Sequence, residues 1–90
     1  MFPLQYCVYI LLSQKDKKFY IGYTSNIARR FYQHCSDQSP ATAPRRPLQL
    51  IFCEFFFSKK DALRRESYFK TTQGKKGLGL VIRESFKEAK

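Results

Sequence analysis

The chain has 90 residues, 43% of them hydrophobic, and its 17 Lys and Arg against seven Asp and Glu give a net charge of +10. This length allows one domain over residues 1–90 and is too short for two cores, while the apolar content excludes general disorder. The positive charge, interleaved with nine Phe and six Tyr, favours nucleic acid as the partner over an anionic membrane.

The first predicted element is a strand over Tyr6–Leu12, a run of seven apolar residues. The run is apolar on both faces, which is typical of a central strand that is covered on both sides. It is too short to span a membrane, no basic segment precedes it and no plausible cleavage site follows it. We therefore expect neither a signal peptide nor a membrane anchor here.

The three cysteines are widely spaced and form no C-x-x-C pair. This pattern favours reduced thiols, half-buried in the core of a cytoplasmic protein. The three are Cys7, Cys35 and Cys53. A zinc site is not expected, because the chain has one histidine.

A polar turn over Ser13–Lys18 leads to a second strand over Phe19–Tyr23. An antiparallel pairing of residues whose numbers sum to 29 would set Tyr9 opposite Tyr20. The two phenols would then share one face of the sheet, and Gly22 would leave room beside Tyr20.

A helix is predicted next, capped by Thr24 or Ser25 and ending near Cys35. Its apolar stripe is Ile27, Ala28, Phe31 and Cys35. At about 100° per residue, Arg30 and His34 flank this stripe on one side, whereas Arg29 points nearly opposite to Phe31. Arg30 is therefore the arginine of this helix that we expect in a site.

The second half of the chain predicts a loop over Ser36–Pro47, a third strand over Leu48–Phe57 and a helix that begins after Ser58. The stripe of that helix reads Ala62, Leu63, Glu66, Phe69 and Lys70. We expect a basic turn over Thr71–Lys76 and a last helix over Leu78–Phe86. The inward residues of that last helix would be Leu78, Val81, Ile82 and Phe86.

Glu66 occupies the middle of an apolar stripe, where a helix that only packs would have Leu. A carboxylate, an arginine and two phenols form a set suited to chemistry on a phosphate. We expect Tyr9, Tyr20, Arg30 and Glu66 to converge on one concave patch, from strand alternation and helix periodicity.

These residues carry a resemblance to a known family. Its first motif corresponds to Cys7-Val8-Tyr9, its second to Tyr20-Ile21-Gly22, its helix motif to Arg30-x-x-x-His34 and its acidic position to Glu66. Over roughly residues 5 to 75 the chain resembles the GIY-YIG nuclease superfamily, which includes the incision subunit of bacterial excision repair (DNA repair) and certain homing endonucleases. The resemblance implies an α/β (α+β) fold, in which a three-stranded antiparallel sheet is flanked by helices in the order β-β-α-β-α(-α).

The resemblance also implies metal-dependent cleavage of phosphodiester bonds. Glu66 would be the ligand of Mg²⁺, or Mn²⁺, because such an ion takes hard oxygen ligands and keeps several waters. Arg30 would hold a phosphate oxygen. Tyr20 would act as the base that activates the attacking water, and Tyr9 would position that water. His34 would be a proton shuttle or a phosphate contact. No small-molecule cofactor is expected.

Each of these residues has a simpler interpretation. The two tyrosines can be packing residues, Glu66 can be the ion-pair partner of Lys70 one turn away, and His34 can interact with the helix dipole. Phosphates of the bound nucleic acid would contact Arg45, Arg46, Lys70, Lys75 and Lys76.

Two features depart from the family pattern: Cys7 replaces the glycine of the first motif, and no asparagine follows Glu66. The alternative is therefore a nucleic-acid-binding protein that keeps the fold without effective cleavage. A third class is an adaptor that binds acidic proteins. DNA is favoured over RNA as the partner, and the oligomeric state is left open.

Overall fold

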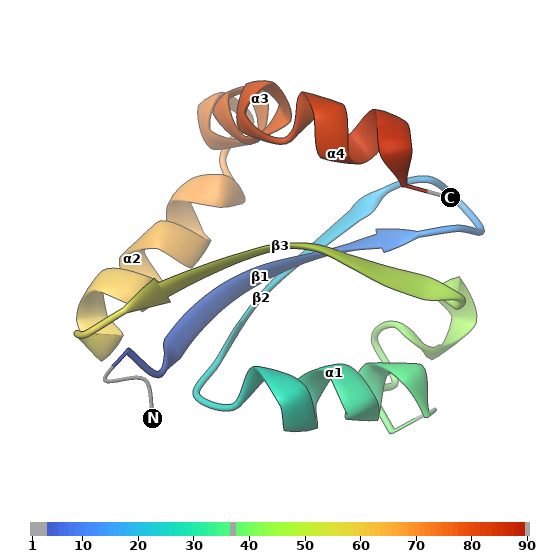
Figure 1. Cartoon of the computed structure of the whole chain (residues 1–90), viewed down its shortest axis with the longest axis horizontal. Helices are drawn as coiled ribbons and strands as arrows, with labels where there is room; N and C mark the ends of the chain where they lie inside the picture. Colours follow the sequence, from blue (N-terminus) through green and yellow to red (C-terminus); the bar gives the residue numbers. More distant parts are fainter. Residues whose placement is uncertain (1–3, 37, 90) are drawn as a thin grey trace.

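The computed structural model describes residues 4–36 and 38–89. The elements in chain order are β1 (Tyr6–Ser13), β2 (Phe19–Thr24), α1 (Ile27–Cys35), the short 3-10 helix η1 (Ala43–Arg45), β3 (Leu48–Phe56), α2 (Lys59–Phe69), α3 (Thr72–Val81) and α4 (Arg83–Glu88). The strands form an antiparallel sheet in the order β2-β1-β3. Helix α1 covers one face, and α2, α3 and α4 lie on the other (Figure 1). The predicted three-stranded α+β fold is confirmed.

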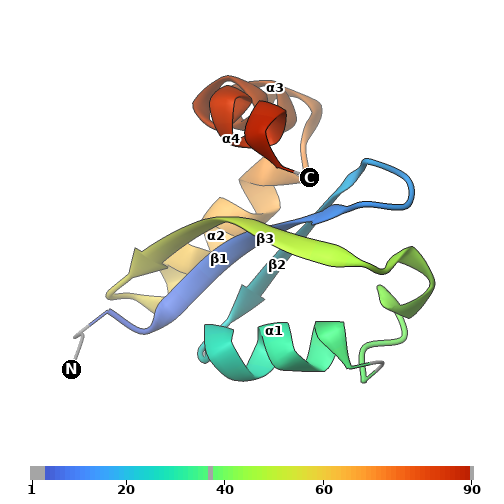
Figure 2. The ribbon, with the colours of Figure 1, turned by 45° about the vertical axis from the view of Figure 1, so that its right-hand side comes forward.

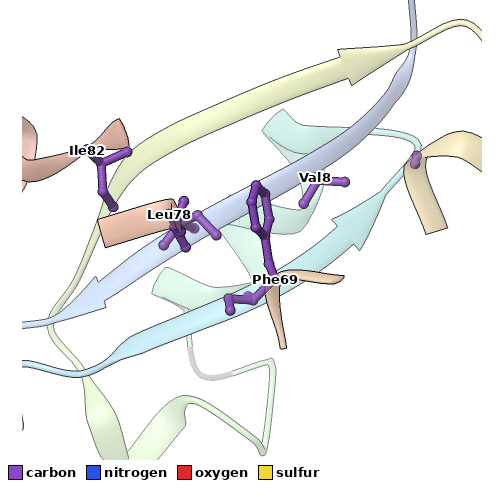
Figure 3. Packing of buried hydrophobic residues seen from close by; sticks show 7 residues of the cluster. Val8, Phe69, Leu78 and Ile82 are labelled. Atoms are coloured by element: carbon purple, nitrogen blue, oxygen red, sulfur yellow. The ribbon is translucent and has the colours of Figure 1, made fainter. Parts of the chain in front are cut away.

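The central strand β1 is buried from Cys7 to Ser13 because helices cover both of its faces. Alternate side chains therefore enter two separate cores. The larger core joins Val8 and Ile10 of β1 to the helices on the α2 side, and Figure 3 shows Phe69, Leu78 and Ile82 in it. The smaller core, on the α1 side, is formed by Cys7, Tyr9 and Leu11 with Tyr20, Ile27, Phe31, Leu48 and Leu50 packed against it.

The register of the β1–β2 hairpin differs from the predicted one by two residues. Tyr9 pairs with Gly22, and Tyr20 pairs with Leu11. The reason is that Ser13 extends β1 instead of starting the turn, with its backbone N–H bonded to the Lys18 carbonyl at 3.0 Å. A shift of two keeps every side chain on its predicted face. Tyr9 and Tyr20 thus still share the α1 face.

Helix α1 begins later than predicted. Asn26 is its cap and accepts a hydrogen bond from the backbone N–H of Arg29 at 3.1 Å, so neither Thr24 nor Ser25 is the cap. The predicted inward stripe is wrong at Ala28 and Cys35, which are exposed. Instead, Ile27, Arg30, Phe31 and His34 are the more buried positions, and the spacing i, i+3, i+4, i+7 puts them on one side of the helix.

The predicted burial of the cysteines is found at one of the three positions. Cys7 is buried, whereas Cys35 and Cys53 are exposed, and all three are free thiols. Cys53 lies on β3, which is one of the two edge strands of the sheet.

The predicted basic turn over Thr71–Lys76 is wrong, because most of it is the start of helix α3. Thr71 caps this helix by accepting from the Gly74 N–H at 3.0 Å. A Cβ on Gly74 would lie 1.8 Å from the Tyr68 carbonyl oxygen, so only glycine lets α3 approach the end of α2 this closely.

The last predicted helix is divided in two at Ile82, where α3 ends and α4 begins. Leu78 and Ile82 are buried as predicted, but Val81 is 67% exposed and Phe86 is 44% exposed. Figure 2 shows α3 and α4 together over the face of the sheet opposite α1. None of the helices in the described part of the chain is long and apolar enough to cross a membrane.

Candidate active site

A buried hydrogen bond between Tyr9 and His34 forms the centre of the site. The phenol oxygen of Tyr9 lies 2.9 Å from His34 Nε2, and the two side chains are 1% and 0% exposed. The ring of Tyr9 extends over Gly22, whose absent Cβ would lie 2.4 Å from Tyr9 Cζ and Oη. Gly22 therefore makes room for Tyr9 and not, as predicted, for Tyr20.

Two buried polar residues in the loop after α1 hydrogen-bond the side chains of His34 and Arg30. Thr42 Oγ1 lies 2.7 Å from His34 Nδ1, and Ser39 Oγ accepts from Arg30 Nη2 at 3.3 Å. The backbone N–H of Thr42 bonds to the Ser39 carbonyl at 3.1 Å, so the two residues belong to one turn. Sequence reasoning missed both, because nothing in a loop without periodicity singles them out.

Arg30 lies half-buried at the edge of this group and connects its members. It donates to Gln33 Oε1 at 3.0 Å and to Ser39, and its guanidinium lies close to the phenols of Tyr9 and Tyr20. Burial opposes its charge, but the contacts with the phenols outweigh burial and raise the pKa of Arg30 above its ordinary value. Arg29 is exposed, as the helical geometry predicted.

Tyr20 lies beside the buried pair and is more open to solvent. Its ring centroid is 5.1 Å from that of His34 and 6.4 Å from that of Tyr9. Unlike Tyr9, it is only partly buried. Of the two phenols, Tyr20 is thus the one that water or a bound phosphate can reach.

Glu66 lies on helix α2, which packs against the face of the sheet opposite α1. It therefore comes from a different layer of the fold than Arg30 and His34. Its charge nevertheless contributes to raising the pKa values of both Tyr9 and Tyr23, which point to opposite faces.

The shifted pKa values of the buried pair keep both side chains uncharged at pH 7. Burial raises the pKa of Tyr9 to about 12, against a lowering by its hydrogen bond with Arg30. Burial, and then the charge of Arg30, lower the pKa of His34 to about 4, so the imidazole is neutral at pH 7. A neutral imidazole has one donor and one acceptor nitrogen, so His34 donates to one of its two partners, the Tyr9 or the Thr42 hydroxyl, and accepts from the other.

The predicted phosphate contacts differ in what surrounds them. Arg45 is ion-paired with Asp16 at 3.1 Å and donates to the carbonyls of Lys18 and Phe19, while Arg46 donates to the carbonyls of Cys35 and Ala43. These bonds give both arginines a structural role in fastening the loop. The remaining predicted contacts, Lys70, Lys75 and Lys76, are exposed.

A sheet of this topology, with phenols, an arginine and a histidine gathered on one face, agrees with the nuclease-type domain that the sequence motifs resemble. The sequence profile of the GIY-YIG catalytic domain matches residues 5–78. The chain belongs to the GIY-YIG family. Cys7, which replaces the glycine of the first motif, does not interrupt β1, because pairing with β2 continues through this residue.

Similar proteins carry the name UPF0213. One from Limosilactobacillus reuteri is 44% identical over 69 residues, covering 73% of this chain and 71% of the relative. YazA of Bacillus subtilis is 39% identical over 77 residues, covering 83% and 78%. The solution NMR structure of a UPF0213 protein from Bacillus halodurans aligns with a TM-score of 0.54 at 34% identity, covering 84% of this chain and 83% of that one.

Proposed function

We propose that this chain is a metal-dependent endonuclease that hydrolyses phosphodiester bonds in nucleic acid, with DNA as the substrate. The observation that carries the proposal is the buried bond of Tyr9 to His34, joined through Arg30 to the more open Tyr20. A hydrogen-bonded, desolvated arrangement of this kind keeps its donors aimed without reorganisation during reaction.

The two phenols have different roles. Tyr9 is buried, fully bonded and has its pKa raised to about 12, so it orients Arg30 and does not take up a proton. Tyr20 lies where water can reach it, and it positions the attacking water or accepts its proton. Arg30 holds a non-bridging oxygen of the phosphate with its planar fork of donors. His34 fixes the Tyr9 phenol, and its low pKa argues against a role as a charged phosphate contact.

The chemistry of Glu66 fits a Mg²⁺ or Mn²⁺ ion. Its carboxylate offers hard oxygens, its side chain is 20% exposed and so accessible, and its present partner is Lys70 at 3.3 Å. The described residues contain no group of three or more His, Cys, Asp or Glu that could hold an ion among themselves. Glu66 would therefore share the ion with water and with substrate phosphate. The bound ion would supply charge stabilisation for the leaving oxygen.

The test is cleavage of end-labelled single-stranded and duplex DNA and RNA, with Mg²⁺, with Mn²⁺ and with chelator. We expect product from the parent with metal only, none from Glu66→Gln, and a loss on the order of 10²-fold for Arg30→Ala. Glu88→Gln is the matched control, because it removes the same charge from an exposed position of α4. All variants should bind DNA about as well as the parent.

Two outcomes would contradict the proposal. If Glu66→Gln cleaves as fast as the parent, Glu66 is not the metal ligand. If the parent cleaves nothing across the substrates and metals, the chain is a binding protein that has kept the nuclease fold.

A further inference from the structure

A second candidate binding site lies on the face of the sheet opposite the Tyr9–His34 pair. It is a groove of about 710 Å³ between the tip of the β1–β2 hairpin and helices α3 and α4. Its floor contains Phe19 and Ile21 of β2 and Phe86 of α4. The rings of Phe19 and Phe86 meet edge to face, with centroids 5.6 Å apart and planes at 85°. One ring thus meets the face of the other with its edge, and Phe86, which is 44% exposed, leaves part of its own ring open for stacking.

The rim of this groove is strongly positive. Five cations line it: Lys17, Lys18, Lys75, Arg83 and Lys87. They come from both sides, two from the hairpin and three from α3 and α4. No acidic residue is among the described residues that line the groove. Glu84 contacts Arg83 and Lys87 at 3.6 and 3.9 Å, but it is exposed and one carboxylate does not neutralise five cations.

We infer that this groove binds a single strand of nucleic acid, with bases against Phe19 and Phe86 and phosphates on the flanking cations. A cationic track with an aromatic floor is the combination that single strands require, because every base has a face that can stack. Paired bases of a duplex are stacked on each other and cannot reach a recessed floor. An anionic membrane favours apolar side chains that protrude beyond the cations, whereas here Phe19 and Phe86 line the same groove as the five cations.

This site goes beyond the proposed nuclease function and does not depend on it, because it uses no residue of the Tyr9–His34 group. The groove would hold the strand without cutting it. Binding is therefore measured in chelator, where cleavage cannot interfere.

The test is fluorescence anisotropy of a labelled oligothymidine and of a labelled duplex of equal length. We expect tighter binding of the single strand, with Phe86→Leu weakening it on the order of tenfold while leaving duplex binding unchanged. Leucine keeps an apolar side chain in contact with Phe19 but removes the stacking surface. Val81→Leu is the control, since Val81 is exposed and does not line the groove.

A second comparison separates the groove from the overall charge. Lys75→Gln with Lys87→Gln should weaken single-strand binding more than Lys59→Gln with Lys60→Gln, which removes the same charge from exposed positions of α2. Equal effects of the two pairs, or an unchanged affinity of Phe86→Leu with retained far-UV circular dichroism, would overturn the inference. So would binding to phosphatidylglycerol vesicles that is lost in Phe86→Leu while oligothymidine binding is retained, because the occupant would then be a membrane.

Discussion

Replacing Gly22 by Ala should displace the Tyr9 phenol and so uncouple it from His34. The added Cβ would lie 2.4 Å from Tyr9 Cζ and Oη, whereas carbon atoms in contact are normally ~3.5–4.0 Å apart. The ring tip must therefore move by about 1 Å or more. Because Tyr9 is 1% exposed and enclosed by Tyr20, His34 and β2, it has no free space to enter.

The cost of this movement has three parts. Overpacking a core by one methyl group costs ~1–3 kcal/mol, and losing the Tyr9–His34 hydrogen bond adds about 1 kcal/mol. Alanine also reduces the conformational freedom of the unfolded chain, which offsets ~0.4–1 kcal/mol of this loss. We expect Gly22→Ala to lower the free energy of unfolding by about 1–4 kcal/mol. Cleavage should fall on the order of 10²-fold, the effect of a displacement of about 1 Å in a catalytic group.

Gly79→Ala is the matched control, because no atom lies within 4 Å of its added Cβ and the residue lies inside helix α3. There the substitution should stabilise the protein by up to about 1 kcal/mol through helix propensity. Urea unfolding followed by far-UV circular dichroism gives both values, since the chain has no Trp. If Gly22→Ala were as stable and as active as the parent, Tyr9 would not be fixed as described, and its orienting role would be refuted.

Three further predictions concern the buried partners and the helix contact. Thr42→Val removes the hydroxyl that lies 2.7 Å from His34 Nδ1; it should cost ~1–3 kcal/mol of stability and slow cleavage, and Thr42→Ser should restore both. His34 has its folded pKa lowered to about 4, so the unfolded chain takes up the proton first and stability should fall by on the order of 3 kcal/mol as pH drops from about 6.5 to 4. This fall in stability with falling pH should be absent in urea titrations of His34→Gln. If it persisted, His34 would not be the group responsible. Gly74→Ala puts a Cβ 1.8 Å from a backbone oxygen and should cost about 3 kcal/mol or more, measured by thermal unfolding.

The sequence was sufficient to predict the strands, the helices and the faces of their side chains where local periodicity decides them. The uninterrupted apolar run of β1 predicted a strand buried on both faces. The shared face of Tyr9 and Tyr20 was predicted correctly despite a register error of two residues, because the side-chain period of a strand is two. The four-residue spacing likewise set Arg30 and His34 on one side of α1. The family motifs rest on these same residues, so the fold and the principal candidate residues could be predicted together.

Other features depend on contacts between residues far apart in the chain. The partners of Arg30 and His34, Ser39 and Thr42, lie in a loop whose sequence has no period, and they are identified only when the loop closes against α1. The start of α3 was missed because Gly74 disfavours a helix locally, whereas its lack of a side chain allows the close packing on α2.

The position of Glu66 was also decided by the tertiary structure. Helix periodicity determines which side of α2 this residue occupies, but not which face of the sheet the helix covers. Packing of Ala62 and Phe69 against Val8 and Ile10 puts α2 opposite α1, and the charge of Glu66 nevertheless contributes to raising the pKa of Tyr9. Local sequence therefore determined the elements and the faces of their side chains. Long-range packing determined how those faces meet, because it depends on the shape and volume of segments that the sequence keeps apart.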